Sequence, residues 1–383
     1  MGFGAIVTTG DGHAAMPGEV MRWIVEARVE MELSKATRFA LRFEDDLCEG
    51  EPAVAGRPEL QANQLVGIFV SVEGAPRCLV IGPITRVRTS SMMGGAGSWV
   101  EVHGEDRRVE MGRVGIQDVW TGKASDAART ILEGYDFVTE VDETRIEYAD
   151  EQHALNQRGT DLAFVEDIAR KNNLEFWLSY EASASPGGVR VDAIQANLKA
   201  SPPRPAGAGV LPAPPVLIAD EGLEIDIQPP PGRCVTVTRF DAHIDFERPN
   251  AAHGFAQAID NGEASATDST PPAAPVNPRA DSIERIQRDT RQVLAPTVTD
   301  PIEQALAAEA QLTEAAWFVE VDCSTTLALI GFPILPHQII EARHAGTRLS
   351  GPYQVKTATH VINAAEHFID FKLRANGLTG AAA

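Results

Sequence analysis

The sequence predicts a mainly β protein with an α+β insert: two antiparallel β-barrels, a small α/β insert and Pro-rich linkers. Three observations predict this fold class. Long stretches alternate between apolar and charged residues with period two, as half-buried strands do. Gly (32) and Pro (25) are frequent while aromatic residues make up only 6% of the 383 residues, which favours many turns and therefore many strands. Two blocks far apart in the chain repeat one series of strands and turns.

The first barrel domain is expected over residues 1–117. In "MRWIVEARVEMEL" the apolar residues share one face and the charged residues share the other, which predicts a long half-buried strand with a bulge. The alternation continues in three further strand candidates, separated by Gly-rich turns: "QLVGIFVSV", "RCLVIGPITRVRTS" and "SWVEVHGED".

An α/β insert followed by a Pro-rich linker is expected over residues 118–219. Ser125 and Thr160 are candidate N-caps of two amphipathic helices, and Gly134 is a stop signal for the first. The strand candidates "TRIEYAD" and "LEFWLSYE" frame the second helix. Residues 182–219 and 261–281 are rich in Pro, Ala and Gly, which is typical of flexible connections.

The second barrel domain is expected over residues 220–383, with an internal linker and helical insertion at about 251–316. Its first strand is the alternating stretch "RCVTVTRFDAHIDFERP", and helices are predicted from Ser282 to about Leu294 and over "PIEQALAAEAQLTEAAW", with Pro301 near the first turn. The chain closes on a predicted hairpin, "GPYQVKTATHVINAAEHFIDFKLRANG".

The two blocks that repeat are the strands around Gly82 and the closing hairpin. Gly82 lies 17 residues before Trp99, and Gly351 lies 17 residues before Phe368. If the repeat is real, the closing hairpin completes a second barrel and needs no catalytic residue. The alternative is that two unrelated hairpins share a spacing by chance.

Composition excludes several classes of partner. A formal net charge of −21 without a Lys/Arg cluster argues against direct binding of nucleic acid, because phosphate binding needs a basic footprint. No stretch is apolar for long enough to span a bilayer, and the N-terminus lacks the pattern of a signal peptide. We therefore expect no membrane partner and a protein that is cytoplasmic during assembly.

The four cysteines are Cys48, Cys78, Cys234 and Cys323. They lie far apart and form no CxxC pair, so neither a zinc ribbon nor a redox motif is predicted. We expect buried thiols in a reducing compartment.

Three stretches carry a resemblance to a known family: "IGPITRVRTS…SWVEVHGEDRRVEMGR", "LNQRGTDLAFVEDIARKNNLEFWLSY" and "FPILPHQIIEARHAGTRLSGPYQVKTATHVI…FIDFKLRA". Their order resembles the hub proteins of contractile tails and injection systems: the phage late-control D family, the myophage baseplate hub and the hub portion of valine-glycine-repeat (VgrG) spike proteins. After Asn376 only "GLTGAAA" remains, so the needle of a full spike is expected on a separate polypeptide.

The resemblance implies a homotrimer in which each chain contributes two tube-like barrels. Three chains then present six barrels, and this ring adapts a hexameric inner tube protein to a trimeric spike protein. Baseplate wedge and tape-measure proteins are further implied partners. The particle itself, whether a phage tail, a tailocin or an injection system, is left open.

Seven residues are candidate assembly residues of this non-enzymatic hub. Basic spots on a mostly acidic chain are interface candidates, and acidic residues of one strand are candidates for the wall of a lumen. The interface candidates are Arg86, Arg88, Lys356 and Lys372, and the lumen candidates are Asp241, Asp245 and Glu247.

The sequence offers little for catalysis. No HExxH, GxSxG or GxxxxGK[ST] motif occurs, and we expect no catalytic residue, no cofactor and no bound metal. A metal or acid/base site on the face shared by Asp241, His243, Asp245 and Glu247 is a minor alternative.

Two histidine pairs, His337 with His344 and His360 with His367, are expected to be unlinked at the surface or in turns. Alternative functions are a tail-associated peptidoglycan hydrolase, which needs only two carboxylates, and a β-rich glycan-binding module.

Overall fold

The structure, a computed structural model, describes residues 3–45, 47–48, 51–52, 54–92, 97–148, 155–186, 188–202, 217, 219–257, 264–268, 280–281, 290–293 and 301–379. The protein is mainly β, as predicted, and its largest sheet has 13 strands. Among the described residues, no helix is both long and apolar enough to cross a membrane.

The first β unit surrounds one apolar core. Its strands follow the order β3-β4-β9-β8-β7, and β1 and β2 continue the sheet beyond β7. Short elements close its ends: α1 (Gly18–Met21), β5 (Leu47–Cys48), β6 (Glu51–Pro52) and η1 (Pro58–Leu60). The main strands are β1 (Ile6–Thr9), β2 (Ala14–Ala15), β3 (Ile24–Glu32), β4 (Arg38–Glu44), β7 (Leu65–Val72), β8 (Ala75–Ser90) and β9 (Trp99–Glu105).

Strand β3 shows why these sequences form strands. Ala27 and Val29 are buried in the core, while Arg28 and Glu30 point to the opposite, polar face of the sheet. The predicted bulge is present, because the register with β4 shifts between Ile24 and Glu26.

The second β unit has the same strand order as the first. Its strands follow the order β18-β23-β26-β25-β24, and β17 pairs with β24 in parallel. When the five strands of each unit are numbered along the chain, both units have the same order in the sheet, 1-2-5-4-3. The elements are β17 (Glu224–Asp226), β18 (Arg239–Ile244), β23 (Val319–Thr326), α7 (Leu327–Ile330), β24 (Ile339–Arg343), β25 (Gly351–Asn363) and β26 (His367–Ala375).

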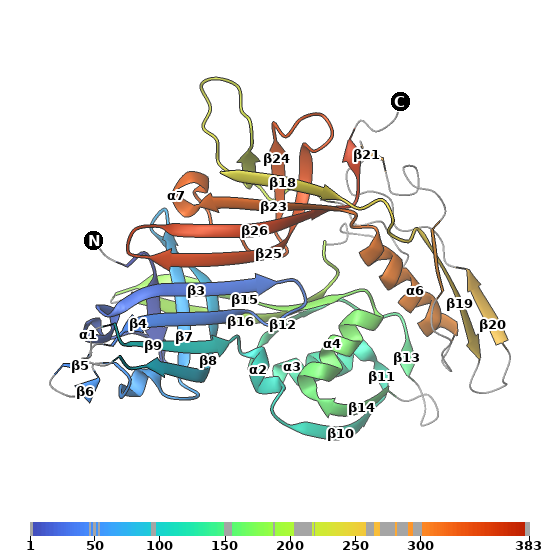
Figure 1. The fold of residues 1–383 in the computed structure, drawn as a ribbon. Coiled ribbons are helices and arrows are strands. Elements are labelled where there is room, and N and C mark those ends of the chain that lie inside the picture. Colours follow the sequence, from blue (N-terminus) through green and yellow to red (C-terminus); the bar gives the residue numbers. More distant parts are fainter. Residues whose placement is uncertain are drawn as a thin grey trace.

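The two β units share one sheet instead of standing apart. Strand β25 of the second unit pairs antiparallel with β3 of the first, from Thr357 opposite Glu32 to Asn363 opposite Glu26. Figure 1 shows the result, with β18, β23, β26, β25 and β3 stacked one after another and β4, β9 and β8 below them. Segments more than 300 positions apart in the chain are therefore neighbours.

The α/β insert packs as a third body with its own core. Strands β15 and β16 form a hairpin that also lies against β8 of the first unit, where Tyr180 is in the apolar contact. Its elements are α2 (Arg108–Met111), β10 (Gly115–Trp120), β11 (Gly122–Lys123), α3 (Ala124–Glu133), β12 (Val138–Val141), β13 (Glu147–Tyr148), β14 (Leu155–Thr160), α4 (Asp161–Lys171), β15 (Glu175–Ser185) and β16 (Gly188–Lys199).

Helix signals in the insert were mostly right. Thr160 caps α4, since its hydroxyl accepts a hydrogen bond from the Ala163 amide at 3.2 Å. Gly134 ends α3 as predicted. Ser125 is not the N-cap of α3, because the helix begins one residue earlier and Lys123 takes that position.

Three other expectations were wrong in part. The stretch from Ala182 to Lys199 is a β-hairpin instead of a linker, because β15 and β16 pair along it. The strand predicted over residues 233–249 is formed only from Arg239 to Ile244. Residues 291–293, expected to be helical, form a strand, and residues 282–289 and 294 lie outside the described part of the chain.

The segment between β18 and β23 forms a small side structure next to the insert. The helix with Pro301 in its first turn is present and packs against β19. The elements here and at the C-terminus are β19 (Ala251–Gln257), β20 (Ala264–Asp268), β21 (Ala280–Asp281), β22 (Arg291–Val293), α6 (Pro301–Ala315) and β27 (Leu378–Thr379). The predicted domain boundaries at residues 117 and 219 remain a proposal.

Two buried arginines join the insert to the sheet. Arg108 forms an ion pair with Asp106 at 2.8 Å and donates to the carbonyl oxygens of Phe176, at 2.8 Å, and Lys35. Arg374 of β26 donates to Gln354 at 2.9 Å. It also forms ion pairs with Glu175, the first residue of β15, at 3.1 Å and with Glu314 of helix α6 (Pro301–Ala315) at 3.0 Å. These charges are paired and hydrogen-bonded, as buried charges must be.

Candidate assembly surface

The two β units are related through a β-bulge in their fourth strands. In β8 the bulged residue is Thr85, opposite His103 and Gly104 of β9. In β25 it is Lys356, opposite Lys372 and Leu373 of β26. Residues at the same distance from the two bulges are equivalent. Arg86 and Thr357 directly follow the bulges, so His103, which stands opposite Arg86, corresponds to Lys372, which stands opposite Thr357.

The equal spacing seen in the sequence joins one pair of equivalent residues and one pair that is not equivalent. Trp99 corresponds to Phe368, because Ser90 stands opposite Trp99 and its equivalent Val361 stands opposite Phe368. Gly82 corresponds to Tyr353 and not to Gly351. The repeat is shown by strand order and by the bulges, and the prediction was wrong only at its glycine end.

Two strand edges of the sheet are unpaired within the described residues. In the second unit, the last half of β25 pairs with β26 on one edge and with β3 on the other. In the first unit, the equivalent half of β8, from Arg86 to Ser90, pairs with β9 only. Strand β18 likewise pairs only with β23 and ends the sheet. In the stack of Figure 1, β18 is the top strand and β8 the bottom one.

Residues on the inner, core-facing side of the sheet are exposed at the unpaired edges of β8 and β18. Val87 of β8 is 40% exposed, whereas Ala358, at the equivalent position of β25, is 0% exposed because β3 covers it. Ala242 of β18 is exposed, whereas its equivalent Val29 of β3 is fully buried. Apolar positions that face a core in one unit thus face solvent in the other.

The outer face of the sheet is polar and carries charges of both signs in cross-strand pairs. Lys372 pairs with Asp322 at 3.0 Å, and Arg88 lies 3.6 Å from Glu101. Asp241 stands directly opposite Asp322. The predicted interface candidates Arg88 and Lys372 and the lumen candidate Asp241 therefore share one face of one sheet, although the sequence assigned them to two different surfaces.

The remaining candidate residues lie beside this face. Lys356, at the bulge of β25, donates to Glu320 at 2.7 Å. Asp245 directly follows β18, and its amide still donates to the carbonyl oxygen of Phe318 at 2.9 Å. Glu247 lies in the turn beyond, where its amide donates to the Asp245 carboxylate at 3.0 Å, so the strand alternation does not extend to Glu247. Arg86 lines a hollow of about 450 Å³ together with Arg38 and His103.

No metal centre forms at the polar stretch of β18. In the described parts of the chain, no group of three or more His, Cys, Asp or Glu residues is arranged to hold a metal ion. The cysteines are also not all buried: Cys78 and Cys323 are buried, but Cys234 is exposed, which corrects that expectation.

The expectation of unlinked histidines was wrong for the closing hairpin. The turn between β25 and β26 brings His360 and His367 onto one inner face of the sheet. The Nδ1 atom of His360 lies 2.8 Å from the Nε2 atom of His367. The Nε2 atom of His360 lies 2.8 Å from the carbonyl oxygen of Ile334. Burial lowers the pKa of His360 to about 4, and burial together with the neighbouring ring lowers the pKa of His367 to about 3. Both rings are core residues.

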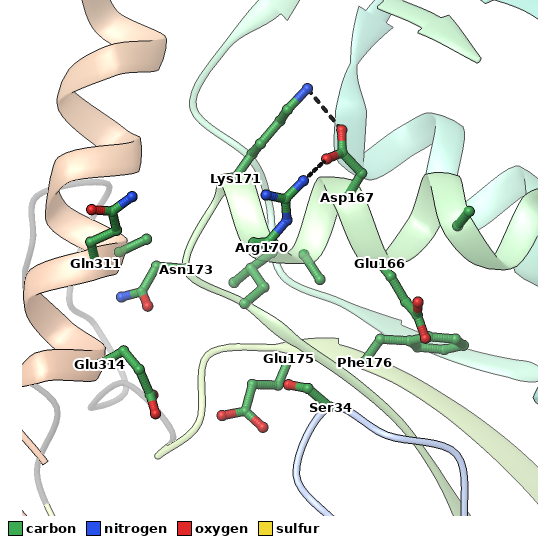
Figure 2. A pocket seen from close by; sticks show the side chains of 14 residues that line it. Ser34, Glu166, Asp167, Arg170, Lys171, Asn173, Glu175, Phe176, Gln311 and Glu314 are labelled. Atoms are coloured by element: carbon green, nitrogen blue, oxygen red, sulfur yellow. Dashed lines mark hydrogen bonds and ion pairs between the residues drawn. The ribbon is translucent and has the colours of Figure 1, made fainter. Parts of the chain in front are cut away.

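One groove of about 690 Å³ lies between α4, the start of β15 and α6 (Figure 2). Glu166, Glu175 and Glu314 border it, while Arg170 and Lys171 turn to Asp167 on the same helix. Burial raises the pKa of Glu166 and that of Glu175, the latter against the opposing effect of Arg374. Perturbed carboxyl groups in a cavity are typical of enzymes, but Glu175 is already bound by Arg374 in the joint described above.

Comparison with known proteins places the fold. No family model matches the sequence, and no curated protein matches it. Among solved structures, a tail protein from Neisseria meningitidis MC58 aligns with a TM-score of 0.59 and 12% identity over 99% of this chain and 98% of that one. The chain has the fold of phage tail proteins.

Two further structures carry the same fold. The 43 kDa tail protein of prophage MuSo2 from Shewanella oneidensis aligns with a TM-score of 0.58 and 10% identity, over 96% of this chain and 97% of that one. A chain of the Francisella PdpA–VgrG complex aligns with a TM-score of 0.53 and 9% identity, over 97% of this chain but only 57% of that one. The resemblance to tail and injection-system proteins expected from the sequence is supported at the level of fold.

Proposed function

We propose that the protein is a structural hub of a contractile tail or injection system, a homotrimer that adapts a hexameric inner tube protein to a trimeric spike protein. One observation carries this proposal: the chain contains two β units with the same strand order and the same bulge. Three copies then offer six similar units, so a threefold assembly presents a nearly sixfold face.

The comparisons support a role in such a particle without specifying it. Two of the similar structures are named tail proteins, and each aligns over nearly its full length. The third belongs to a complex that contains VgrG. Baseplate wedge and tape-measure proteins remain expected partners of the hub.

The proposal is tested by the native mass and shape of the purified chain. We expect a trimer by native mass spectrometry, and six similar lobes in electron-microscopy averages viewed down its axis. A stable monomer at micromolar concentration, or a ring of three lobes without further division, would contradict the hub.

The groove of Figure 2 is the observation that favours a second candidate, a peptidoglycan hydrolase. Two carboxyl groups with raised pKa values, Glu166 and Glu175, would have to act as the catalytic pair. We expect the purified chain to leave peptidoglycan intact at pH 5 to 8. Clearing by the parent chain that disappears in both Glu166→Gln and Glu175→Gln would establish the enzyme instead.

A glycan-binding module fits the surface less well. Such modules display aromatic rings to solvent, yet no Trp or Tyr is among the exposed large apolar residues, which include Phe246 and Phe368. The indole of Trp99 has the guanidinium groups of Arg42 and Arg88 over its ring at 4.8 and 5.8 Å.

A further inference from the structure

We propose that β18 of one copy pairs antiparallel with the Arg86–Ser90 half of β8 in a neighbouring copy, in the register that β3 takes on β25 within the chain. This inference rests on the proposed trimer and names the contact that closes it. The described residues of each copy offer one edge of each kind, so the contact is head-to-tail and generates a closed ring when the rotation per copy permits closure.

The junction inside the chain supplies the template. There, Thr357, Thr359 and Val361 of β25 stand opposite Glu32, Glu30 and Arg28 of β3. Counting from the bulges, the equivalents of these three β25 residues in β8 are Arg86, Arg88 and Ser90, listed in the same order.

The residues of β18 that correspond to those of β3 are found by following the paired residues from strand to strand across each unit. Arg28 stands opposite Ala40, which stands opposite His103. In the second unit, Asp241 stands opposite Asp322, which stands opposite Lys372. Because His103 corresponds to Lys372, Asp241 corresponds to Arg28. By the same count His243 corresponds to Glu30, and Asp245 to Glu32.

The transferred register brings opposite charges together. Arg86 of one copy falls opposite Asp245 of the next, Arg88 opposite His243, and Ser90 opposite Asp241. Diagonal neighbours on a sheet are about 7–8 Å apart at Cα, within reach of an arginine, so Arg88 is also near Asp241 and Asp245. Four residues that the sequence marked as basic interface or acidic lumen candidates thus meet at one contact.

The inner face gains apolar burial from the same pairing. Val87 would stand opposite Ile244, and Thr89 opposite Ala242, as Ala358 stands opposite Met31 and His360 opposite Val29 within the chain. The template residues are all buried, whereas Val87, Thr89 and Ala242 are exposed and Ile244 is half-buried. Pairing would extend the cores of both units across the contact.

The charges also disfavour pairing between two β8 edges. Such a contact would bring Arg86 and Arg88 of one copy against the same arginines of the other. Like charges directly opposite each other destabilise a sheet, so the mixed contact is favoured over this self-pairing.

Cysteine cross-linking tests the register directly. In a Cys48→Ser, Cys234→Ser background, the pair Ser90→Cys and Asp241→Cys is placed directly opposite across the contact, and mild oxidation should give a covalent trimer on a non-reducing gel. In the control pair, Ser90→Cys and Asp245→Cys, the second cysteine lies four residues after Asp241 and one residue beyond β18, so this pair should stay uncross-linked.

The outcomes separate the two proposals. A native trimer without this cross-link, or one cross-linked by the control pair, overturns the strand pairing and leaves the hub standing. A parent chain that remains monomeric overturns the hub and the pairing together. A covalent trimer from the first pair alone supports both.

Charge reversal gives an independent readout. Arg86→Asp and Asp245→Arg should each raise the dissociation constant of the trimer at least about tenfold, and the double variant should restore most of the loss. Arg38→Asp is the matched control, because Arg38 lies on the same face in a central strand, and it should leave assembly unchanged. Equal effects of Arg38→Asp and Arg86→Asp, or no rescue by the double variant, contradict the pairing.

Discussion

Val87 and Ala358 occupy the same position in two copies of one β unit, two residues after the bulge of the fourth strand, yet only Ala358 is shielded from solvent. The difference lies in what comes next in the sheet. Strand β3 covers the edge of β25, and nothing within the described chain covers the matching edge of β8. The pairing of β25 with β3 is therefore an example, within the chain, of the strand contact that the described residues do not provide for β8.

Substitution at these two positions should act on different properties. Val87→Asp is expected to change the stability of the isolated chain by less than about 0.5 kcal/mol, because the site is exposed, while weakening the trimer. Ala358→Asp should destabilise the chain by more than about 3 kcal/mol, since it places an unpaired charge in a core. Urea unfolding at high dilution and native mass spectrometry separate the two effects. Equal loss of chain stability in both variants would contradict the equivalence.

Salt should weaken the assembly more than the fold. The contact between copies is expected to be held by Arg86 and Arg88 against Asp241 and Asp245, whereas the junction within the chain carries no such set of opposite charges. Raising NaCl from about 0.05 to 0.5 M should raise the dissociation constant of the trimer roughly tenfold, with little effect on chain unfolding. Analytical ultracentrifugation measures it, and a salt-independent trimer would count against the charged register.

Removal of Arg374 should be costly. Its guanidinium is 4% exposed and compensates the buried carboxylate of Glu175, so Arg374→Met is expected to cost about 3–5 kcal/mol of unfolding free energy. Lys372→Met, two residues away on the same strand, breaks the exposed pair with Asp322 and should cost less than about 1 kcal/mol. Denaturant unfolding compares them, and similar costs would show that the joint is not needed for stability.

Acid should weaken the fold through the histidine pair. Because burial lowers the folded-state pKa of His360 to about 4, below the ordinary value of 6.5, the unfolded chain binds the proton first as pH falls. The stability from the neutral ring is present above pH 6.5 and is lost between pH 6.5 and pH 4, on the order of 3 kcal/mol for this residue.

His367, whose pKa is lowered to about 3, acts in the same direction over a window that extends lower. His360→Gln is expected to cost stability at pH 7, since Ile334 loses a hydrogen-bond donor, and to flatten the stability curve between pH 4 and 6.5. Urea unfolding across that range measures it. A variant with the same slope as the parent chain would show that the histidines are not the source.

The bulge of β8 should depend on a glycine. A Cβ at Gly104 would lie 2.2 Å from Phe39 Cζ and 2.5 Å from the Pro83 carbonyl oxygen, so Gly104→Ala should cost about 1–3 kcal/mol. Gly56→Ala, where a Cβ meets no atom within 4 Å, is the control and should be nearly neutral. Thermal unfolding distinguishes them, and a neutral Gly104→Ala would mean that the strands shift freely.

Local patterns predicted the strands well because alternation reports directly which face of a strand is buried. The stretches that became β3, β7, β8, β9, β25 and β26 were all recognised in this way. The pattern failed at β18, where alternation continues past Ile244 although the backbone turns after Asp245. It also failed for His360 and His367, because spacing along the chain ignores the turn that folds one strand onto the other.

The sequence by itself determined the β class, the helix caps at Thr160 and Gly134, and the presence of a repeat with basic and acidic candidates. Only the tertiary structure decided which strands are neighbours, that β25 joins β3, and that no strand of the described residues pairs with the outer edges of β8 and β18. The physical reason is that alternation fixes the face of a side chain, whereas the partner of a backbone edge is chosen by long-range pairing, and an edge strand and a central strand share the same local pattern.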